Sequence, residues 1–322
     1  MLAGAIVVTA FGIRPARIAV AQTMIRGEIG ARLDTLLRRS ADFGFAGAAV
    51  VSKNGEVILA QGYGDANRST GTPITVETPF FLGSIAKQFT AAAVLRLEAD
   101  GKLSRTDSLG RFFPPAPADK RSITVEQLLR HTSGLPYLPS AGLFGPGSRD
   151  AVMDEMLRET LDSRPGERYG YSSPGYTLLA GIIERVSGTS YEQFLTDRLF
   201  TPAGLTSTGF IGDSVRWRGT DVVAYSDGVA QLPLADIPAF PRAVGAGSVI
   251  GTVQDLHRWQ RALVTGTILQ KPQLDALFEP VVEIGGATRG GMAWSIIPIP
   301  QGVLRLAAGD IGGYNAELRD YH

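Results

Sequence analysis

The sequence predicts an α+β fold in which an antiparallel sheet flanked by helices carries an inserted all-helical subdomain. Strand-like runs gather near both ends of the 322-residue chain, and residues 102–240 read as helices joined by loops rich in proline and glycine. An apolar content of 44% and a charged content of 19% fit a globular protein with a sizeable core. We expect one such domain over residues 22–322, with its sheet part at about 25–83 and 245–322 and its helical part at about 84–244.

The predicted domain begins with a helix and a hairpin. Apolar residues recur at helical spacing between residues 25 and 41, which predicts an amphipathic helix. Two apolar runs, residues 47–53 and 56–62, then flank Asn54-Gly55. Asn-Gly between such runs is the strongest short-range signal for a two-residue hairpin turn. The sheet therefore opens with an antiparallel pair of strands.

A serine and a lysine one helical turn apart form the most informative feature of the chain. Ser84 and Lys87 stand at the start of a helical run, residues 85–100, that Gly101 closes. One face of this helix presents both a hydroxyl and an amine. If the amine is buried, desolvation lowers the lysine pKa, and the neutral lysine activates the serine as a nucleophile. The alternative is an N-cap serine followed by a solvated lysine.

A tyrosine-rich turn is the second candidate site. Tyr171 lies in the run 169–176, shortly after the Pro-Gly turn at residues 165–167 and before a predicted helix. Such a turn directs a tyrosine hydroxyl into a cleft, and a nearby ammonium group lowers the tyrosine pKa so that the phenolate serves as a base. The alternative is a turn whose tyrosines pack on the core.

A glycine-rich segment, residues 309–314, is the third candidate site, and it follows the apolar run 303–308. Glycines at a strand let a substrate approach the backbone. We expect a free backbone N–H here to supply half of an oxyanion hole, with the amide of Ser84 as the other half. The alternative is an ordinary glycine-rich turn.

His131 opens the segment His-Thr-Ser-Gly-Leu-Pro at the end of a predicted helix. A histidine has the chemistry of a general base for Ser84, but at a helix end before such a turn it is more often a cap or a packed core residue, and we favour that role. The remaining periodic segments predict helices at 125–131, 176–187 and 252–265, with Thr252 as an N-cap, and strands at 291–298, 303–308 and 314–318.

Composition excludes several classes of function. The formal net charge is zero and no Lys/Arg-rich run occurs, so we expect no nucleic-acid partner. The absence of cysteine excludes disulfides, thiolate metal sites and cysteine nucleophiles. Three scattered histidines are too few for a histidine-rich metal site, and we expect neither a metal nor a cofactor. The expected partner is a small-molecule or peptide substrate.

The N-terminal stretch, residues 1–21, has features of a signal peptide. An apolar run at residues 2–13 is too short to span a bilayer, and the small-x-small pattern at residues 19–21 resembles a signal-peptidase site. We therefore expect an exported protein, periplasmic or extracellular, without strong membrane association beyond that segment. The alternative is a cytoplasmic protein with an N-terminal extension, because Arg14 and Arg17 lie between the apolar run and the cut.

Four motifs occur in order along the chain: Ser-x-x-Lys, His-Thr-Ser-Gly-Leu-Pro, Pro-Gly-x-x-Tyr-x-Tyr-Ser and the glycine-rich segment. Together they resemble the serine β-lactamase and penicillin-binding protein superfamily, in particular the class C-like branch that also holds esterases and D-aminopeptidases. The resemblance covers roughly residues 27–320. It implies an antiparallel sheet flanked by helices, an all-helical subdomain, and an active site at their junction.

The resemblance implies a serine hydrolase that acts through an acyl-enzyme on an ester or amide, as an esterase, a D-aminopeptidase or a β-lactamase-like enzyme. It makes Ser84 the nucleophile, Lys87 its helical partner, and Tyr171 a general base and later proton donor. It makes Gly313, next to Gly312, the source of the second oxyanion N–H. The alternative is a non-catalytic, penicillin-binding-like binding or sensor protein.

Three departures from the superfamily pattern bear on this function. Ser173 replaces an asparagine that helps to hold the lysine and the substrate, and a hydroxyl supplies only part of what that amide does. Asp310 stands at the basic position of Lys-Thr-Gly or His-x-Gly, where its charge would repel a β-lactam carboxylate and raise the Tyr171 pKa. This charge favours a neutral ester or a substrate with a free amine. The superfamily sheet usually continues past this motif with another strand and a C-terminal helix, whereas this chain stops at His322, so we also expect an uncovered sheet edge after the last strand.

Overall fold

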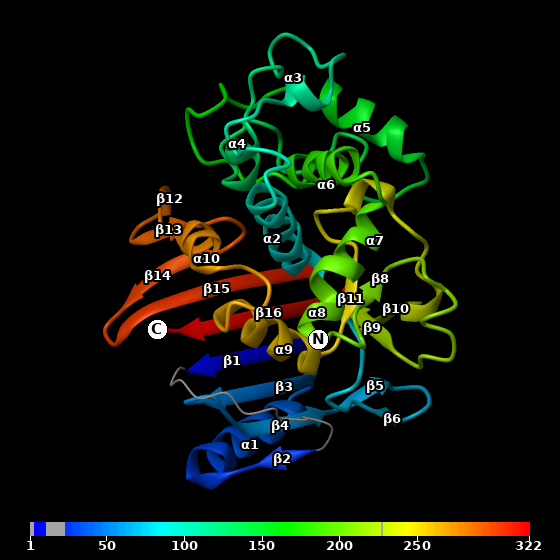
Figure 1. Cartoon of the computed structure of the whole chain (residues 1–322). Helices are drawn as coiled ribbons and strands as arrows, with labels where there is room; N and C mark the ends of the chain where they lie inside the picture. The colour runs from blue at the N-terminus through cyan, green and yellow to red at the C-terminus, as the bar shows by residue number, and fades with distance from the viewer. Residues whose placement is uncertain (1–2, 11–22, 227) are drawn as a thin grey trace.

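A nine-stranded sheet lies at the centre of the computed structural model, which describes residues 3–10, 23–226 and 228–322 (Figure 1). Its strand order is β12-β13-β14-β15-β16-β1-β3-β4-β2. The bounds of these strands are β1 Ala3–Ala10, β2 Met24–Ile25, β3 Ala46–Lys53, β4 Glu56–Tyr63, β12 Val282–Gly285, β13 Thr288–Gly290, β14 Ser295–Ile299, β15 Gly302–Ile311 and β16 Tyr314–Tyr321. Strands from both ends of the chain thus share one sheet, which confirms the predicted α+β class.

The middle of the chain forms the helical part, most of which Figure 1 shows above the sheet, with α2 running from the sheet into it and α8 at the level of the sheet. Its helices are α2 Ala86–Ala99, α3 Leu109–Phe112, α4 Val125–Leu129, α5 Arg149–Arg158, α6 Ser173–Ser187, α7 Tyr191–Leu195, the π-helix η2 Thr196–Phe200 and α8 Thr201–Ala203. The remaining helices are α1 Gly27–Asp42, α9 Val253–Val264, α10 Lys271–Phe278 and the 3-10 turns η1 Gly83–Ile85, η3 Leu234–Asp236 and η4 Pro241–Ala243. Short strands complete the fold: β5 Asp65–Asn67, β6 Thr72–Pro73, β7 Phe80–Phe81, β8 Gly209–Phe210, β9 Val223–Ser226, β10 Val229–Pro233 and β11 Val249–Gly251.

Local signals explain most of these elements. Asn54 and Gly55 both have positive φ, 52° and 82°, as a type I′ turn requires, so the predicted β3–β4 hairpin is confirmed. Helix α9 begins after Thr252, whose hydroxyl accepts from the backbone N–H of Asp255 at 3.2 Å, as predicted for an N-cap. Ser172 caps α6 in the same way through the N–H of Gly175.

Strand β1 occupies a position that the sequence did not predict. It lies between β16 and β3 and runs parallel to both, so that Ala3 pairs with Tyr314 and with Ala46. The prediction of an uncovered edge after the last strand is therefore wrong for the described residues, because β1 pairs with β16. The pairing groups of β3 and β16 face each other across one strand width, and a third strand satisfies both sets.

The expected signal peptide overlaps β1, and its predicted cleavage site at residues 19–22 lies outside the described residues. Cleavage there stays a prediction. Among the described residues, no helix is both long enough and apolar enough to cross a membrane.

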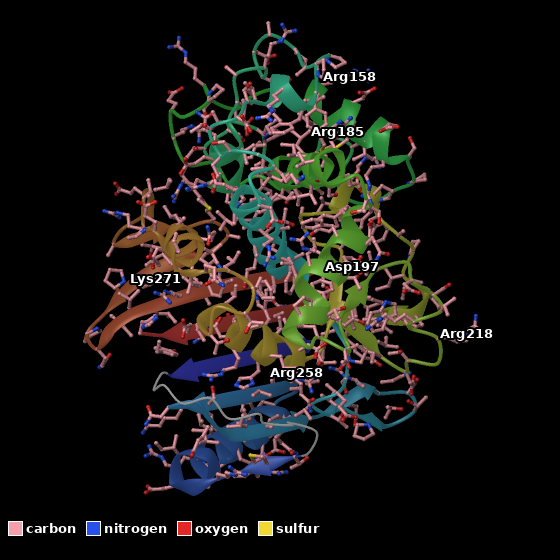
Figure 2. The ribbon with its side chains drawn as sticks, in the orientation of Figure 1. Arg158, Arg185, Asp197, Arg218, Arg258 and Lys271 are labelled. Atoms are coloured by element: carbon pink, nitrogen blue, oxygen red, sulfur yellow. The ribbon has the colours of Figure 1, made fainter. Side chains whose placement is uncertain are left out.

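Charged side chains lie mainly at the periphery. Figure 2 shows Arg158, Arg218 and Lys271 at the outer margin of the molecule, away from the junction of the sheet and the helical part. The Lys271 side chain, for example, is 82% exposed.

Candidate active site

Ser84 lies where the sheet meets the helical part. It belongs to the 3-10 turn η1, which leads directly into α2 and packs against β15. The approach is so close that a Cβ atom at Gly309 would collide with the Leu82 carbonyl oxygen and lie 2.8 Å from the Ser84 nitrogen. Gly309 is therefore the glycine that permits the strand to pass beside the serine.

Three polar side chains converge with Ser84, as the sequence predicted. The Lys87 amine donates to Ser84 Oγ at 3.1 Å, and the Tyr171 hydroxyl donates to the same oxygen at 2.7 Å. Lys87 Nζ also lies 2.7 Å from the Ala246 carbonyl oxygen and 3.5 Å from Ser173 Oγ. The structure thus places Ser84, Lys87, Tyr171 and Ser173 in one hydrogen-bonded group.

Lys87 is buried without a charged hydrogen-bond partner. Its side chain is only 2% exposed, and the hydrogen-bond partners that the structure gives it are two hydroxyl oxygens and a carbonyl oxygen. Burial disfavours the ammonium form and lowers the lysine pKa from 10.5 to about 7. Near neutral pH a large fraction of Lys87 is therefore a free amine able to accept a proton.

Tyr171 has the opposite shift. Burial raises its pKa to about 12, although the hydrogen bond with Ser84 pulls the value down. The prediction that Tyr171 serves as a phenolate base is therefore wrong. Burial destabilises the phenolate itself, and it also destabilises the Lys87 ammonium that was expected to stabilise the phenolate. At neutral pH Tyr171 is a protonated hydroxyl, suited to donating a proton rather than to accepting one.

The strand beside Ser84 corrects three of the predicted site residues. A cavity of about 230 Å³ opens at Ser84, and β15 lines it with Leu306, Ala307 and Ala308 rather than with the residues expected. Gly312 and Gly313 instead form the turn between β15 and β16, with φ of 55° and 82°. A Cβ atom on Gly313 would meet Ala224 and Tyr225, so this glycine packs toward β9.

Asp310 contributes its backbone to this region, while its side chain is absent from the cavity lining. Val303 exchanges both backbone hydrogen bonds with His322, at 2.8 Å each, so the odd-numbered residues of β15 bond toward β16. The N–H of Asp310 therefore points away from β16, and its nitrogen lies 3.0 Å from the position that a Cβ on Gly83 would take. Because Gly83 adjoins Ser84, Asp310 rather than Gly313 is placed to give the second backbone donor.

The alignment of β15 beside η1 also changes which residue stands at the superfamily's basic position. If Gly309 is the glycine of Lys-Thr-Gly or His-x-Gly, the basic residue falls on Ala307, which is buried and lines the cavity. The prediction that Asp310 reverses the charge at the basic position is therefore wrong. That position is held by Ala307, which carries no charge. The sequence contained two candidate glycines, Gly309 and Gly312, and no local signal showed which of them meets Ser84.

The far wall of the cavity was missed by the sequence analysis. It is formed around β12 to β14, and its members are Ile284, Gly290, Gly291, Ala293, Trp294 and Ser295. Ala293 adopts a φ of 63°, a left-handed conformation that is unusual for alanine. Only Gly290-Gly291 and Trp294 could have indicated this wall from the sequence. Among the described residues, no cluster of three histidine, aspartate or glutamate side chains is arranged to hold a metal.

The Beta-lactamase family model matches residues 33–314, most of the chain. The chain belongs to the serine β-lactamase and penicillin-binding protein superfamily. It is 30% identical over 258 residues to the "Putative penicillin-binding protein PbpX" of Bacillus subtilis, covering 80% of this chain and 63% of that protein. It therefore spans less than two thirds of that relative's length.

Solved structures agree with this assignment. A penicillin-binding protein homologue from Pyrococcus abyssi, described as octameric, has a TM-score of 0.74 at 26% identity and covers 90% of this chain and 70% of its own. A D-stereospecific amidohydrolase from Streptomyces sp. has a TM-score of 0.61 at 28% identity and covers 73% and 76% of the two chains. The superfamily thus contains serine hydrolases that share this fold.

Proposed function

We propose that the protein is a serine hydrolase that cleaves an ester or amide through an acyl-enzyme on Ser84. One observation carries the proposal: Ser84 Oγ lies within hydrogen-bonding distance of both Lys87 Nζ and the Tyr171 hydroxyl. The first group is a base near neutral pH and the second is an acid, so the serine has a proton acceptor and a proton donor at once.

Acylation follows from this geometry. Neutral Lys87 takes the proton of Ser84 while Oγ bonds to the substrate carbonyl carbon, whose oxygen gains the negative charge. As the bond to the leaving group breaks, the leaving group takes the Tyr171 proton, and the Lys87 ammonium restores that proton to the tyrosine. The serine proton thus ends on the leaving group, and the two side chains return to their starting states.

Two backbone amides, of Ser84 and Asp310, would stabilise the oxyanion. Backbone donors of this kind are held in place before the reaction begins and need no reorganisation when charge develops. Water then attacks the acyl-enzyme, with Lys87 accepting its proton. The bond between the acyl carbon and Ser84 Oγ breaks, Oγ takes that proton back, and the acid is released. No cofactor takes part in either step.

The lining of the cavity indicates an uncharged substrate. The lining contains no aspartate, glutamate or arginine, its basic side chains Lys87 and His131 are both buried, and Ile284, Trp294 and Leu306 are apolar. A β-lactam or a peptide with a free carboxylate would find no cation from β15 in the cavity, because Ala307 stands at the position that is basic in the superfamily pattern. We therefore rank a carboxylic ester first, a D-amino acid amide or peptide second, and a β-lactam last. The Streptomyces relative, described as a D-stereospecific amidohydrolase, supports the second class.

A second candidate is a non-catalytic binding or sensor protein with the same fold. Ala307 and Ser173 favour it, because they replace a cation and an amide at two positions of the superfamily pattern. Such a protein would show acylation without turnover, or no acylation. The geometry at Ser84 makes catalysis the stronger proposal.

The deciding experiment is intact-mass analysis after incubation with a fluorophosphonate. We expect a single adduct on the full chain and none on Ser84→Ala. A screen of ester, D-amino acid amide and β-lactam substrates then ranks the classes. Absence of an adduct on protein that melts cooperatively would contradict the hydrolase proposal and favour the binding protein.

A further inference from the structure

His131 occupies a backbone position that normally belongs to glycine. Helix α4 ends at Leu129, and the N–H groups of His131 and Thr132 bond back to the carbonyls of Leu128 and Gln127, at 3.3 and 2.8 Å. This is a Schellman motif, in which the residue after the C-cap takes a left-handed conformation. His131 takes it with a φ of 57°, although glycine would do so without strain. Strain of this kind persists where the side chain has a task.

The His131 side chain and backbone hold Tyr171 from three directions. The His131 carbonyl accepts from the N–H of Gly170 at 2.8 Å, and Nδ1 accepts from the N–H of Ser172 at 3.0 Å. The two residues that flank Tyr171 are thus tied to one histidine. The imidazole also stacks on the Tyr171 ring, with centroids 4.4 Å apart and planes inclined by 25°.

The imidazole is itself held from its surroundings. The Tyr176 ring lies 4.9 Å away, centroid to centroid, and its hydroxyl is anchored on the Leu129 carbonyl at 2.7 Å. The Tyr169 and His131 rings form a T-shaped pair, with centroids 5.9 Å apart and planes inclined by 79°. Only 4% of His131 is exposed, so the ring has little freedom to move. Tyr171 therefore rests against a fixed surface.

We propose that His131 is a positioning residue that keeps the Tyr171 hydroxyl on Ser84, acting as a neutral imidazole with its proton on Nε2. The proposal rests on the proposed hydrolase function, because it concerns the proton donor of that reaction. His131 makes no hydrogen bond to Ser84 and exchanges no proton with it. Its role is to fix the 2.7 Å contact between Tyr171 and Ser84.

The neutral tautomer follows from the hydrogen bond at Nδ1. That nitrogen accepts from a backbone N–H, so it carries no proton, and the proton of the neutral ring lies on Nε2. An imidazolium would leave the Ser172 N–H facing another donor. Burial and the nearby Lys87 agree with this state, since they lower the His131 pKa to about 3.

Three substitutions separate the contributions of His131. His131→Gly suits the left-handed conformation and removes the whole side chain. His131→Asn tolerates that conformation and supplies Oδ1 as an acceptor for the Ser172 N–H, but it removes the stacked ring. His131→Phe keeps a ring and removes the acceptor. We expect the glycine variant to melt cooperatively and to lose about 10- to 100-fold in kcat, with little change in KM, because a small misplacement of a reacting group has that effect.

The partial replacements test whether the two contacts act together. We expect His131→Asn and His131→Phe each to retain more kcat than His131→Gly, because each keeps one of the two side-chain contacts with the Tyr171 segment. The same loss in all three variants, or wild-type kcat in the glycine variant, would overturn the proposal.

A double-mutant cycle with Tyr171→Phe tests whether His131 acts through Tyr171. In the Tyr171→Phe background the hydroxyl is already missing, so His131→Gly should reduce kcat by less than about 2-fold further. An equal loss in both backgrounds would show that His131 acts through another group or through the fold, and the proposal would fail.

A crystal structure of His131→Gly gives a readout that does not need activity. We expect the Tyr171 hydroxyl to lie more than about 3.5 Å from Ser84 Oγ, beyond hydrogen-bonding distance. An unchanged distance would overturn the proposal. If the wild type fails to react with the fluorophosphonate, the hydrolase function fails, and this distance still decides the role of His131.

Discussion

Two walls meet at Ser84, and they present different kinds of groups to a substrate. The helical wall carries Lys87, Tyr171 and Ser173, all within hydrogen-bonding distance of Ser84 or of one another. The strand wall carries the side chains of residues 306–308, which have no polar atom, together with backbone amides. The helical wall therefore retains the groups that move protons, while the strand wall has no side chain that recognises charge.

The groups that carry out the reaction therefore lie on the helical wall, and the strand wall affects which substrates bind. A substrate that depends on a charged anchor loses binding at the strand wall, whereas a neutral one loses nothing there. The two walls can be altered independently, because the helical wall is built on α2 and the start of α6 and the strand wall on β15.

The largest effect is expected from Lys87→Met, which keeps the buried chain length and removes the base. Loss of a positioned general base reduces the rate by about 10²–10⁴-fold, so fluorophosphonate labelling of Ser84 should slow by at least about 10²-fold. Lys102→Met is the matched control, because Lys102 is exposed and lies outside the cavity. Labelling of Lys87→Met at the wild-type rate would show that the helical wall does not activate Ser84.

Removal of residues 1–21 tests how the strand wall is supported. Without β1, the facing edges of β3 and β16 lose their partners over eight residues, and we expect unfolding free energy to fall by at least about 2 kcal/mol. Hydrogen exchange should accelerate more in β15 and β16 than in α2, because β16 and β1 connect β15 to β3 and β4 in the sheet. Denaturant titration and exchange measurements check both points.

The same truncation bears on export. We propose that residues 1–21 direct export, and a mature protein that starts at Gln22 would show it by N-terminal sequencing. A truncated protein as stable as the full chain would contradict a structural role for β1 and fit a leader that is removed. A clear loss of stability would instead argue that the segment is retained.

The pH dependence of activity reports the base on the helical wall. Lys87 acts as the free amine, and its pKa is lowered to about 7, so kcat/KM should rise with pH and reach half its plateau near pH 7. Below that point it should fall about tenfold per pH unit. Tyr171 acts in its protonated form, and its pKa of about 12 predicts no descending limb up to about pH 10. A bell-shaped profile with its maximum near pH 8 would contradict these roles.

A cation added to the strand wall should change substrate preference. Ala307→Lys places an ammonium in the cavity at the position that is basic in the superfamily pattern, and Ala307→Met is the uncharged control of similar length. We expect the ratio of kcat/KM for an anionic to a neutral substrate to rise about tenfold in the lysine variant relative to the methionine variant. An unchanged ratio would show that charge at this wall does not select the substrate.

The two walls also differ in how well the sequence predicted them. Ser84 and Lys87 lie three residues apart, in η1 and in the first turn of α2. Tyr171 lies in a turn with its own local signal, so the helical wall followed from short-range patterns. The strand wall depended on the alignment of β15 against η1, which are more than 200 residues apart. Gly309 and Gly312 fitted the motif equally well, and only the contact with Leu82 distinguishes them.

The fold shows the same division. The hairpin at Asn54-Gly55 and the cap at Thr252 are local and were predicted correctly. Strand β1 was not, because the apolar run at residues 2–13 matches a leader and a strand equally well, and its partner β16 lies at the other end of the chain. Pairing over such a separation leaves no local signature.

The smallest predicted effect concerns the far wall of the cavity, around β12 to β14. Ala293 has a φ of 63°, and an alanine there is strained by about 1–2 kcal/mol, against about 0.4–1 kcal/mol of extra chain entropy that glycine loses on folding. Ala293→Gly should therefore raise the unfolding free energy by up to about 1 kcal/mol. Ala287→Gly, at an exposed position without positive φ, is the control and should lower it. Denaturant midpoints check both changes. If Ala293→Gly gains stability but loses kcat/KM, the strained alanine shapes the cavity beside Trp294, and the far wall contributes to the geometry in which the substrate is held.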